Sequence, residues 1–175
     1  MPNPSDLRSL IREIPDFPKP GILFRDVTPL LGNGPAFRSC IRQLCERVAA
    51  NRPQMIAGIE SRGFIFGASV AVELGLGFVP IRKPGKLPWK TRQERYSLEY
   101  GTDAIEVHED AVGPDTRVAL VDDLLATGGT AGAAIKLLQN LGGKVVIAGF
   151  VIELVALGGR KQLGDVPTEV LISYA

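Results

Sequence analysis

The fold class is decided by one stretch of the sequence, 117-RVALVDDLLATGGT-130. Its first five residues predict a buried strand, and two adjacent carboxylates, Asp122 and Asp123, follow directly. A polar turn of threonine and glycine comes next, and a helical pattern begins at once over residues 131–141. A strand, a polar turn and a helix in this order are typical of an α/β protein with a parallel sheet.

The polar turn has the composition of a phosphate-binding loop. Open N–H groups at a helix N-terminus, the hydroxyls of Thr127 and Thr130 and the positive end of the helix dipole all favour an anion. Two carboxylates beside it would repel a bare polyphosphate, so we expect them to face sugar hydroxyls or Mg²⁺. The stretch therefore predicts a ligand with a phosphate next to a diol, such as a ribose 5-phosphate. The alternative is a turn that uses glycine and threonine only to cap the helix.

Short apolar segments alternate with helical patterns along the rest of the chain, which predicts a central parallel sheet with helices on both faces. Its length of 175 residues suits a single domain, residues 1–175. The expected strands are 55–59, 77–81, 96–100, 104–107, 117–121, 144–150 and 169–173, and the expected helices are 6–14, 34–50, 63–74, 131–141 and a broken one at 154–163. We expect the helix at 63–74, which is apolar over most of its surface, to be buried, and residues 83–95 to form a mobile loop. Polar turns at 60–63, 82–86 and 122–130 follow three of these strands, so they should share one site.

Composition and charge argue against several classes of protein. The formal net charge of +1 gives no sign of a nucleic-acid partner, and no apolar run reaches membrane-spanning length. The first residues lack the pattern of a secretory signal. Cys40 and Cys45 lie five positions apart in one predicted helix, so we expect neither a disulfide nor a metal site from them. A reducing, cytoplasmic location suits these cysteines.

The 117–130 stretch resembles the signature of the type I phosphoribosyltransferases, which bind 5-phosphoribosyl 1-pyrophosphate. The sequence contains neither a Gly-x-x-x-x-Gly-Lys-Ser/Thr loop nor a Gly-x-Gly-x-x-Gly motif after a strand. The resemblance implies the fold of that family, with Asp122 and Asp123 holding the ribose hydroxyls. It also implies Mg²⁺ as cofactor, bound through the ligand or by the two aspartates. The 5-phosphate would be held by Ala126, Thr127, Gly128, Gly129 and Thr130.

Two further segments contain candidate pyrophosphate ligands. In the turn 60-ESRG-63, Arg62 could bind a phosphate in a bidentate manner, while the amides of Ser61 and Gly63 donate to it. The alternative is a surface arginine at a helix start. The resemblance implies a pyrophosphate-binding loop here, with a cis peptide bond between Glu60 and Ser61. The basic cluster at 82–86 is either a solvated loop or a source of two more pyrophosphate ligands, Lys83 and Lys86. Its expected position opposite the acidic pair favours this role for Lys83 in particular.

The stretch 96-YSLEYG-101 resembles the closing loop of those family members that use adenine. Glu99 and Tyr100 would then move over the site, and a loop hinged near Gly85 and Gly101 could exclude water. The resemblance makes Glu99 a candidate for proton exchange with the purine nitrogens and gives Tyr100 a role in loop closure. The alternative is a plain edge hairpin with Glu99 pointing outward.

The stretch 20-PGILFRD-26 resembles the base-binding hood of the same enzymes, to which residues 1–33 would contribute. Phe24 would stack on adenine, and the backbone at Leu23 and Arg25 would read the base edge. A carbonyl acceptor there favours the 6-amino group over a 6-oxo group, which would leave it unpaired. Leu124 would line the other face of the base. The alternative is that Phe24 simply packs into the core.

The resemblance as a whole implies a homodimeric enzyme of purine salvage. It would convert adenine and 5-phosphoribosyl 1-pyrophosphate into AMP and pyrophosphate. Two alternatives remain on the same fold: a non-catalytic regulator that senses 5-phosphoribosyl 1-pyrophosphate, and an enzyme that uses hypoxanthine, guanine, xanthine or orotate. The chain has neither the spare length nor the charge expected of a regulator, and the hood and the closing loop argue against the other bases.

Overall fold

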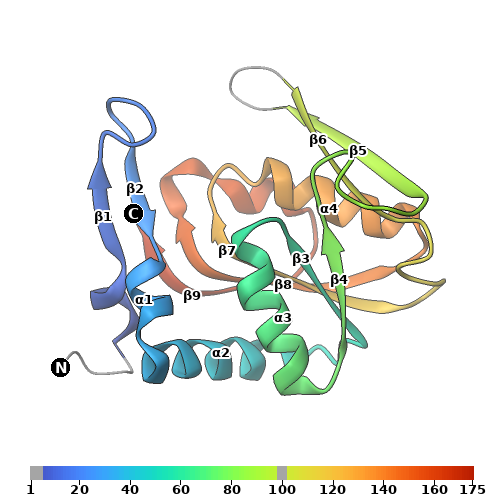
Figure 1. Cartoon of the computed structure of the whole chain (residues 1–175), viewed down its shortest axis with the longest axis horizontal. Helices are drawn as coiled ribbons and strands as arrows, with labels where there is room; N and C mark the ends of the chain where they lie inside the picture. The colour runs from blue at the N-terminus through green and yellow to red at the C-terminus, as the bar shows by residue number, and fades with distance from the viewer. Residues whose placement is uncertain (1–5, 98–101) are drawn as a thin grey trace.

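Five parallel strands form the central sheet of this computed structural model, which describes residues 6–97 and 102–175. The strand order is β4–β3–β7–β8–β9, so the chain crosses over between β4 and β7 (Figure 1). The strands are β3 (Met55–Ile59), β4 (Gly77–Ile81), β7 (Arg117–Leu125), β8 (Lys144–Leu154) and β9 (Thr168–Tyr174). The prediction of a parallel α/β sheet is therefore confirmed.

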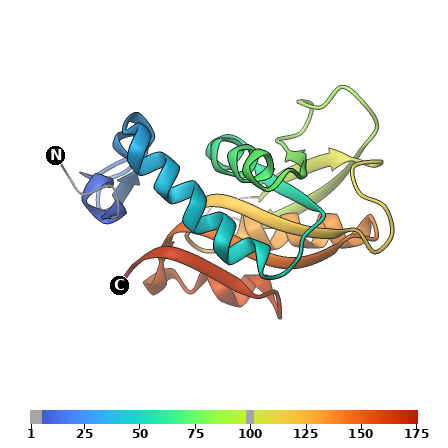
Figure 2. The same ribbon diagram turned by 90° about the horizontal axis from the view of Figure 1, so that it is seen from below.

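Helices cover both faces of the sheet because its strands are apolar on both sides. On β7, Ala119 and Val121 join the core under α2 (Gly34–Ala49) and α3 (Arg62–Leu74). Val118 and Leu120 alternate with them and pack into a second core with α4 (Gly129–Asn140). Figure 2 shows α2 and α3 on one side of the sheet, with α4 and the 3₁₀ helices η2 (Val155–Leu157) and η3 (Gly159–Leu163) on the other.

The N-terminal segment differs from the prediction. The expected helix over 6–14 was wrong: a 3₁₀ helix, η1 (Leu7–Leu10), is followed by the strand β1 (Arg12–Pro15). β1 pairs antiparallel with β2 (Leu23–Asp26), ahead of the short helix α1 (Thr28–Gly32). Pairing with β2, which follows β1 after a proline-rich turn, outweighs the weak local helix propensity of these residues. The β1–β2 hairpin stands beside β9, where the Arg8 side chain donates to the Ser173 carbonyl at 2.6 Å (Figure 1).

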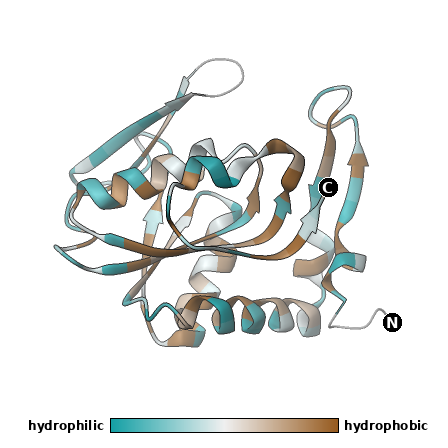
Figure 3. Ribbon diagram, turned by 180° about the vertical axis from the view of Figure 1, so that it is seen from behind, coloured by the Kyte–Doolittle hydropathy of each residue, from teal (hydrophilic) through white to brown (hydrophobic). Residues whose placement is uncertain are grey.

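A second hairpin replaces the last part of the loop expected at 83–95. Strand β5 (Thr91–Ser97) pairs antiparallel with β6 (Thr102–His108), so the loop prediction was wrong from residue 91 onward. The strand predicted to start at residue 96 in fact starts at Thr91. Residues 92–95 are all polar, so no apolar pattern in the sequence predicts this strand. Figure 3 shows much of the hairpin in the teal of hydrophilic residues. Buried Tyr96, Ile105 and Val107 hold the hairpin against the core.

The strands around the predicted site are longer than the sequence suggested. β7 continues to Leu125 and β8 to Leu154, so Asp122 and Asp123 lie within a strand rather than after it. Pairing of Asp122 with Phe150 and of Leu125 with Glu153 extends the ladder over these polar residues. The other predicted elements match within a few residues, with 154–163 forming η2 and η3 in place of a broken helix.

Helix α3 is not fully buried, contrary to the prediction. Val72 is 82% exposed and Ile65 is 40% exposed, although the opposite face of α3 packs into the core through Phe66 and Val70. An apolar helix face thus remains open to solvent in the single chain. Among the residues that the structure describes, no helix is long and apolar enough to cross a membrane.

Candidate active site

The three polar turns predicted to share a site meet at the carboxyl edge of the sheet. They line a cavity of about 330 Å³, which is bounded by residues 59–62, Lys83 and residues 122–131. Strands β3, β4 and β7 end at this edge, and α3 and α4 begin there. In an open parallel sheet this is the place where ligands bind, since helix N-termini and loop side chains converge on it.

The loop at residues 126–130 presents open backbone amides to the cavity. Gly128 has a φ of +80°, a left-handed conformation that side chains disfavour, and it is the N-cap of α4. No side chain caps this helix, which argues against the reading of the turn as a simple capping device. The first N–H groups of α4 and the positive end of its dipole therefore remain available to an anion.

Asp122 lies half-buried beside this loop. Its Oδ1 accepts the amide of Asp123 at 2.9 Å, and a Cβ added to Gly63 would lie only 2.5 Å from the same oxygen. A side chain at position 63 would therefore displace the carboxylate. Burial, together with the neighbouring charge of Asp123, raises the pKa of Asp122 well above its ordinary value of 3.8. One proton consequently stays on this acidic pair at pH values where an exposed aspartate has lost it.

Asp123 is buried and paired with Arg62. The Arg62 Nε lies 2.6 Å from Asp123 Oδ2, yet this oxygen accepts no hydrogen bond within the described residues. The pair is held by charge, and an acceptor position on Asp123 remains unused. The guanidinium of Arg62 also lies 5.2 Å from the ring centroid of Phe24, which links the N-terminal hairpin to the cavity.

Lys83 is held at the rim of the cavity by the β5–β6 hairpin. Its ammonium forms an ion pair with Asp103 and donates to the Tyr96 hydroxyl at 2.8 Å. Burial disfavours the charged form of Lys83, but these hydrogen bonds outweigh it and raise its pKa. The Lys83 amide donates to Glu60 Oε2 at 3.0 Å. Lys86 does not line the cavity, and its amide donates to Glu106 Oε1 at 3.2 Å.

Three residues of this arrangement were missed at the sequence level. Glu60 accepts both the Lys83 amide and Arg82 Nε, the latter at 2.9 Å, and thereby joins two of the polar turns. Its place directly before Ser61 could have suggested this role. Tyr96 and Asp103 meet Lys83 only because β5 pairs with β6, and no sequence pattern announces that contact. The expected cis peptide bond between Glu60 and Ser61 is present.

Only one of the predicted adenine-binding residues lines the cavity. Leu124 lines it directly, whereas Leu23, Phe24 and Arg25 belong to β2 and do not. Phe24 is partly exposed and packs edge-to-face on Phe17 with a centroid distance of 5.1 Å, so it does not belong to the core. The Arg25 side chain pairs with Glu13, which leaves its backbone as the part able to read a base. Glu99 and Tyr100 lie outside the described residues.

Comparison with known proteins agrees with this geometry. A family model described as "Phosphoribosyl transferase domain" matches residues 31–166. The chain is 57% identical to the adenine phosphoribosyltransferase of Cyanothece sp., over 97% of this chain and 99% of that protein. It is 55% identical to the adenine phosphoribosyltransferase of Parvibaculum lavamentivorans, over 95% of each chain.

Solved structures of the same kind superpose closely. The adenine phosphoribosyltransferase from Thermoanaerobacter pseudethanolicus has a TM-score of 0.95 at 49% identity, covering 98% of this chain and 100% of that one. The enzyme from Saccharomyces cerevisiae, solved in complex with adenine and a bisphosphate, has a TM-score of 0.92 at 38% identity, covering 96% and 97%. The chain therefore belongs to the phosphoribosyltransferase family and, within it, to the adenine phosphoribosyltransferases.

Proposed function

We propose that this protein transfers the 5-phosphoribosyl group from 5-phosphoribosyl 1-pyrophosphate to adenine, giving AMP and pyrophosphate. The observation that carries the proposal is one cavity in which a phosphate loop, an acidic pair and two cations meet at the carboxyl edge of the sheet. These are the groups that a ribose with a 5-phosphate and a 1-pyrophosphate requires.

The proposed reaction is displacement at the anomeric carbon of the ribose. The amides and hydroxyls of residues 126–130 would hold the 5-phosphate, so that binding remote from the reaction centre orients the reacting carbon. Asp122 and Asp123 would bind the ribose hydroxyls, and the ionised member of the pair would stabilise positive charge that grows on the ring. Arg62, Lys83 and the amides of Ser61 and Gly63 would stabilise the departing pyrophosphate, with Lys86 reaching it only from outside the cavity.

The ion pairs of the free protein suggest how the ligand would be received. Arg62 is held by Asp123 and Lys83 by Asp103, so neither cation is left unpaired before binding. A pyrophosphate would offer both cations stronger partners, since charge-assisted bonds to phosphate are short and bidentate for arginine. Release of Asp123 from Arg62 would then allow it to accept a ribose hydroxyl.

Adenine would bind between Phe24 and Leu124, with backbone groups at Leu23 and Arg25 reading its edge. The complex of the Saccharomyces cerevisiae enzyme with adenine supports a base site in this fold. We assign proton exchange with the purine nitrogens to Glu99 and loop closure to Tyr100, both of which lie outside the described residues. Residues 1–33 would act as the hood of a single catalytic domain, residues 1–175.

The acidic pair fits Mg²⁺ only as part of a site that the ligand completes. Carboxylate oxygens suit this cation, and Asp123 Oδ2 has acceptor capacity to spare. The described residues contain no group of three or more His, Cys, Asp or Glu side chains that could hold a metal by themselves. The raised pKa of Asp122 also favours a hydroxyl partner for that side chain. When bound, Mg²⁺ would neutralise charge on the pyrophosphate.

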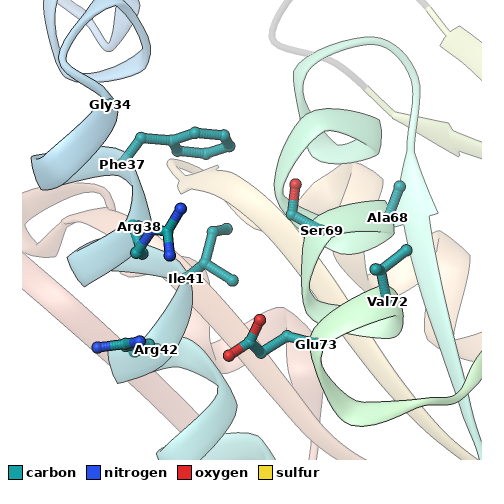
Figure 4. Close-up of a pocket in the computed structure, with 9 residues that line it drawn as sticks. All are labelled: Gly34, Phe37, Arg38, Ile41, Arg42, Ala68, Ser69, Val72 and Glu73. Carbon is teal, nitrogen blue, oxygen red and sulfur yellow. The ribbon is translucent and has the colours of Figure 1, made fainter.

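We also propose a homodimer formed through the open face of α3. A groove between α2 and α3 is lined by apolar Phe37, Ile41 and Val72, with arginines on α2 and Glu73 on α3 (Figure 4). Two copies related by a twofold axis would bury Val72 and bring the arginines of one copy near the glutamate of the other.

Burial of Cys40 and Cys45 as free thiols supports a cytoplasmic location.

The substrate assignment is tested with a panel of bases in the presence of 5-phosphoribosyl 1-pyrophosphate and Mg²⁺. We expect AMP and pyrophosphate from adenine, and turnover of hypoxanthine, guanine and xanthine lower by about 10⁴-fold or more, because their 6-oxo group leaves the base-reading carbonyl unpaired. Orotate, a pyrimidine without a 6-amino group, should be excluded at least as strongly. Product formation is followed by chromatography. Equal turnover of hypoxanthine would contradict the assignment of adenine as the base. The absence of turnover with every base would contradict the proposed phosphoribosyl transfer.

The acidic pair is tested by Asp122→Asn combined with Asp123→Asn. We expect kcat to fall by roughly 10²-fold or more, since the amides cannot stabilise a cationic ring as carboxylates do. Far-ultraviolet circular dichroism should remain that of the wild type, because the amides keep the shape of the side chains. Near-normal kcat would remove the pair from the mechanism.

The single variant Asp122→Asn separates function from stability. Because the pKa of Asp122 is raised in the folded state, the ionised side chain costs stability as the pH rises above its ordinary pKa of 3.8. The asparagine variant lacks this cost, so its free energy of unfolding should exceed that of the wild type at neutral pH, and the difference should shrink toward pH 4. Urea titrations at both pH values measure it. A less stable variant at neutral pH would show that the raised pKa has no energetic consequence.

The role of Glu99 is tested by Glu99→Ala. A proton-transfer role predicts a fall in kcat of about 10²-fold, with the KM for adenine nearly unchanged. Glu99→Gln serves as the matched control, since it keeps the size of the side chain but cannot exchange the proton, and it should be equally slow. A rise in KM for adenine alone would make Glu99 a binding residue.

The dimer surface is tested by Val72→Glu, which places a charge in the proposed interface. We expect the wild type to sediment as a dimer and this variant as a monomer, because a buried unpaired carboxylate opposes association. Val155→Glu is the control, since Val155 is 50% exposed on η2, away from the groove. A Val72→Glu protein that sediments as a dimer would place the interface elsewhere.

A further inference from the structure

The phosphate loop has a second layer of backbone behind it, formed by η3. A Cβ added to Gly128 would lie 2.2 Å from the carbonyl oxygen of Gly159, and one added to Gly159 would lie 2.3 Å from the carbonyl oxygen of Ala126. The two chain segments are therefore in direct backbone contact at the loop that is proposed to hold the 5-phosphate. A shift of η3 cannot leave that loop unchanged.

The first turn of α4 rests on the same support. A Cβ added to Gly132 would lie 2.6 Å from the carbonyl oxygen of Gln162, which also belongs to η3. Gly132 donates its amide to the carbonyl of Gly128 at 2.8 Å, which is the bond that starts the helix. The orientation of the open amides of α4 thus depends on where η3 lies.

Arg160 fastens η3 to the sheet. Its Nε and Nη2 donate to the two carboxylate oxygens of Glu153, each at 2.8 Å, and its Nη1 donates to the Thr168 carbonyl at 2.9 Å. Glu153 is buried at the end of β8 and pairs in register with Leu125, the residue directly before the phosphate loop. One guanidinium therefore joins the last residues of β8, the start of β9 and the 3₁₀ helix behind the loop.

Arg160 also neutralises a buried negative charge next to an anion site. The Glu153 side chain is 6% exposed, and a carboxylate at such a place is costly without a partner. Left unpaired, it would repel a phosphate bound at the neighbouring loop, residues 126–130. The bidentate pair removes that repulsion and fixes the geometry at the same time.

We propose that Arg160 is a positioning residue for the 5-phosphate, acting through Glu153 and through the contact of Gly159 with Gly128. Arg160 does not line the cavity and so acts without touching the ligand. The inference rests on the proposed function, because it names the support of the loop that binds the sugar phosphate. It predicts that damage to the pair weakens the binding of 5-phosphoribosyl 1-pyrophosphate and leaves adenine binding intact.

The test compares Arg160→Gln with the wild-type enzyme. We expect the KM for 5-phosphoribosyl 1-pyrophosphate to rise about tenfold or more, while the KM for adenine changes by less than about twofold, since a displaced loop loses contacts only to the phosphate. Arg160→Lys keeps the charge and should lose less. Arg47→Gln is the control, because it breaks an ion pair of the same length, 2.8 Å to Glu169, on the exposed surface. That variant should match the wild type in both constants.

The double variant Glu153→Gln with Arg160→Gln separates two explanations. It removes the buried charge together with its partner, so we expect it to recover part of the affinity lost by Arg160→Gln alone. A double variant as impaired as the single one would overturn the route through the charge of Glu153. If both KM values rose together, or only the melting temperature fell, the pair would be merely structural. If Arg160→Gln does not fold, the same two constants of Arg160→Lys decide between these outcomes.

Failure of the proposed function is recognised separately. A wild-type protein that turned over no base would contradict the reaction, and the positioning role would then be read from calorimetry with ribose 5-phosphate. Its dissociation constant should be about tenfold higher for Arg160→Gln than for the wild type. Equal dissociation constants would overturn the inference whatever the reaction is.

Discussion

In the proposed mechanism, the binding of one phosphate by backbone amides is the constraint on which the rest of the site depends. These amides are free because Gly128 turns the chain sharply out of β7 and no side chain caps α4. Once the phosphate end of a ligand is fixed there, the positions of its ring and its leaving group follow from the distances within the molecule. In the proposed complex Asp122 would lie next to the ring and Arg62 beyond it, and both residues line the same cavity.

The charges of this site are arranged so that the empty protein tolerates them. Each cation of the proposed pyrophosphate side has an acidic partner, Asp123 for Arg62 and Asp103 for Lys83, and burial together with the charge of Asp123 raises the pKa of Asp122. An anionic ligand then replaces carboxylates rather than water around the cations. Such an exchange requires little rearrangement of solvent, which is the condition under which fixed charges stabilise a transition state well.

The sequence was sufficient where local chemistry determines structure. The stretch 117–130 forms the predicted strand, turn and helix start at a sheet edge, because apolar residues and glycines each have one role there. Prediction failed where a distant partner decides: β1 is a strand because β2 pairs with it, and the polar strand β5 exists because β6 does. The contact of Lys83 with Asp103 follows from that second pairing, so no pattern in the chain could have revealed it.

The same distinction explains why the support behind the phosphate loop escapes a reading of the sequence. Gly158 and Gly159 look like ordinary loop glycines, and Arg160 looks like a surface cation. Only the register of β8 on β7 brings Glu153 beside Leu125 and makes its carboxylate a neighbour of the anion site. A buried acid at such a place needs a fixed cation, and the fixed cation in turn fixes the backbone on which Gly128 rests. The Arg160 side chain thus both neutralises the buried carboxylate of Glu153 and holds the backbone behind the loop in place.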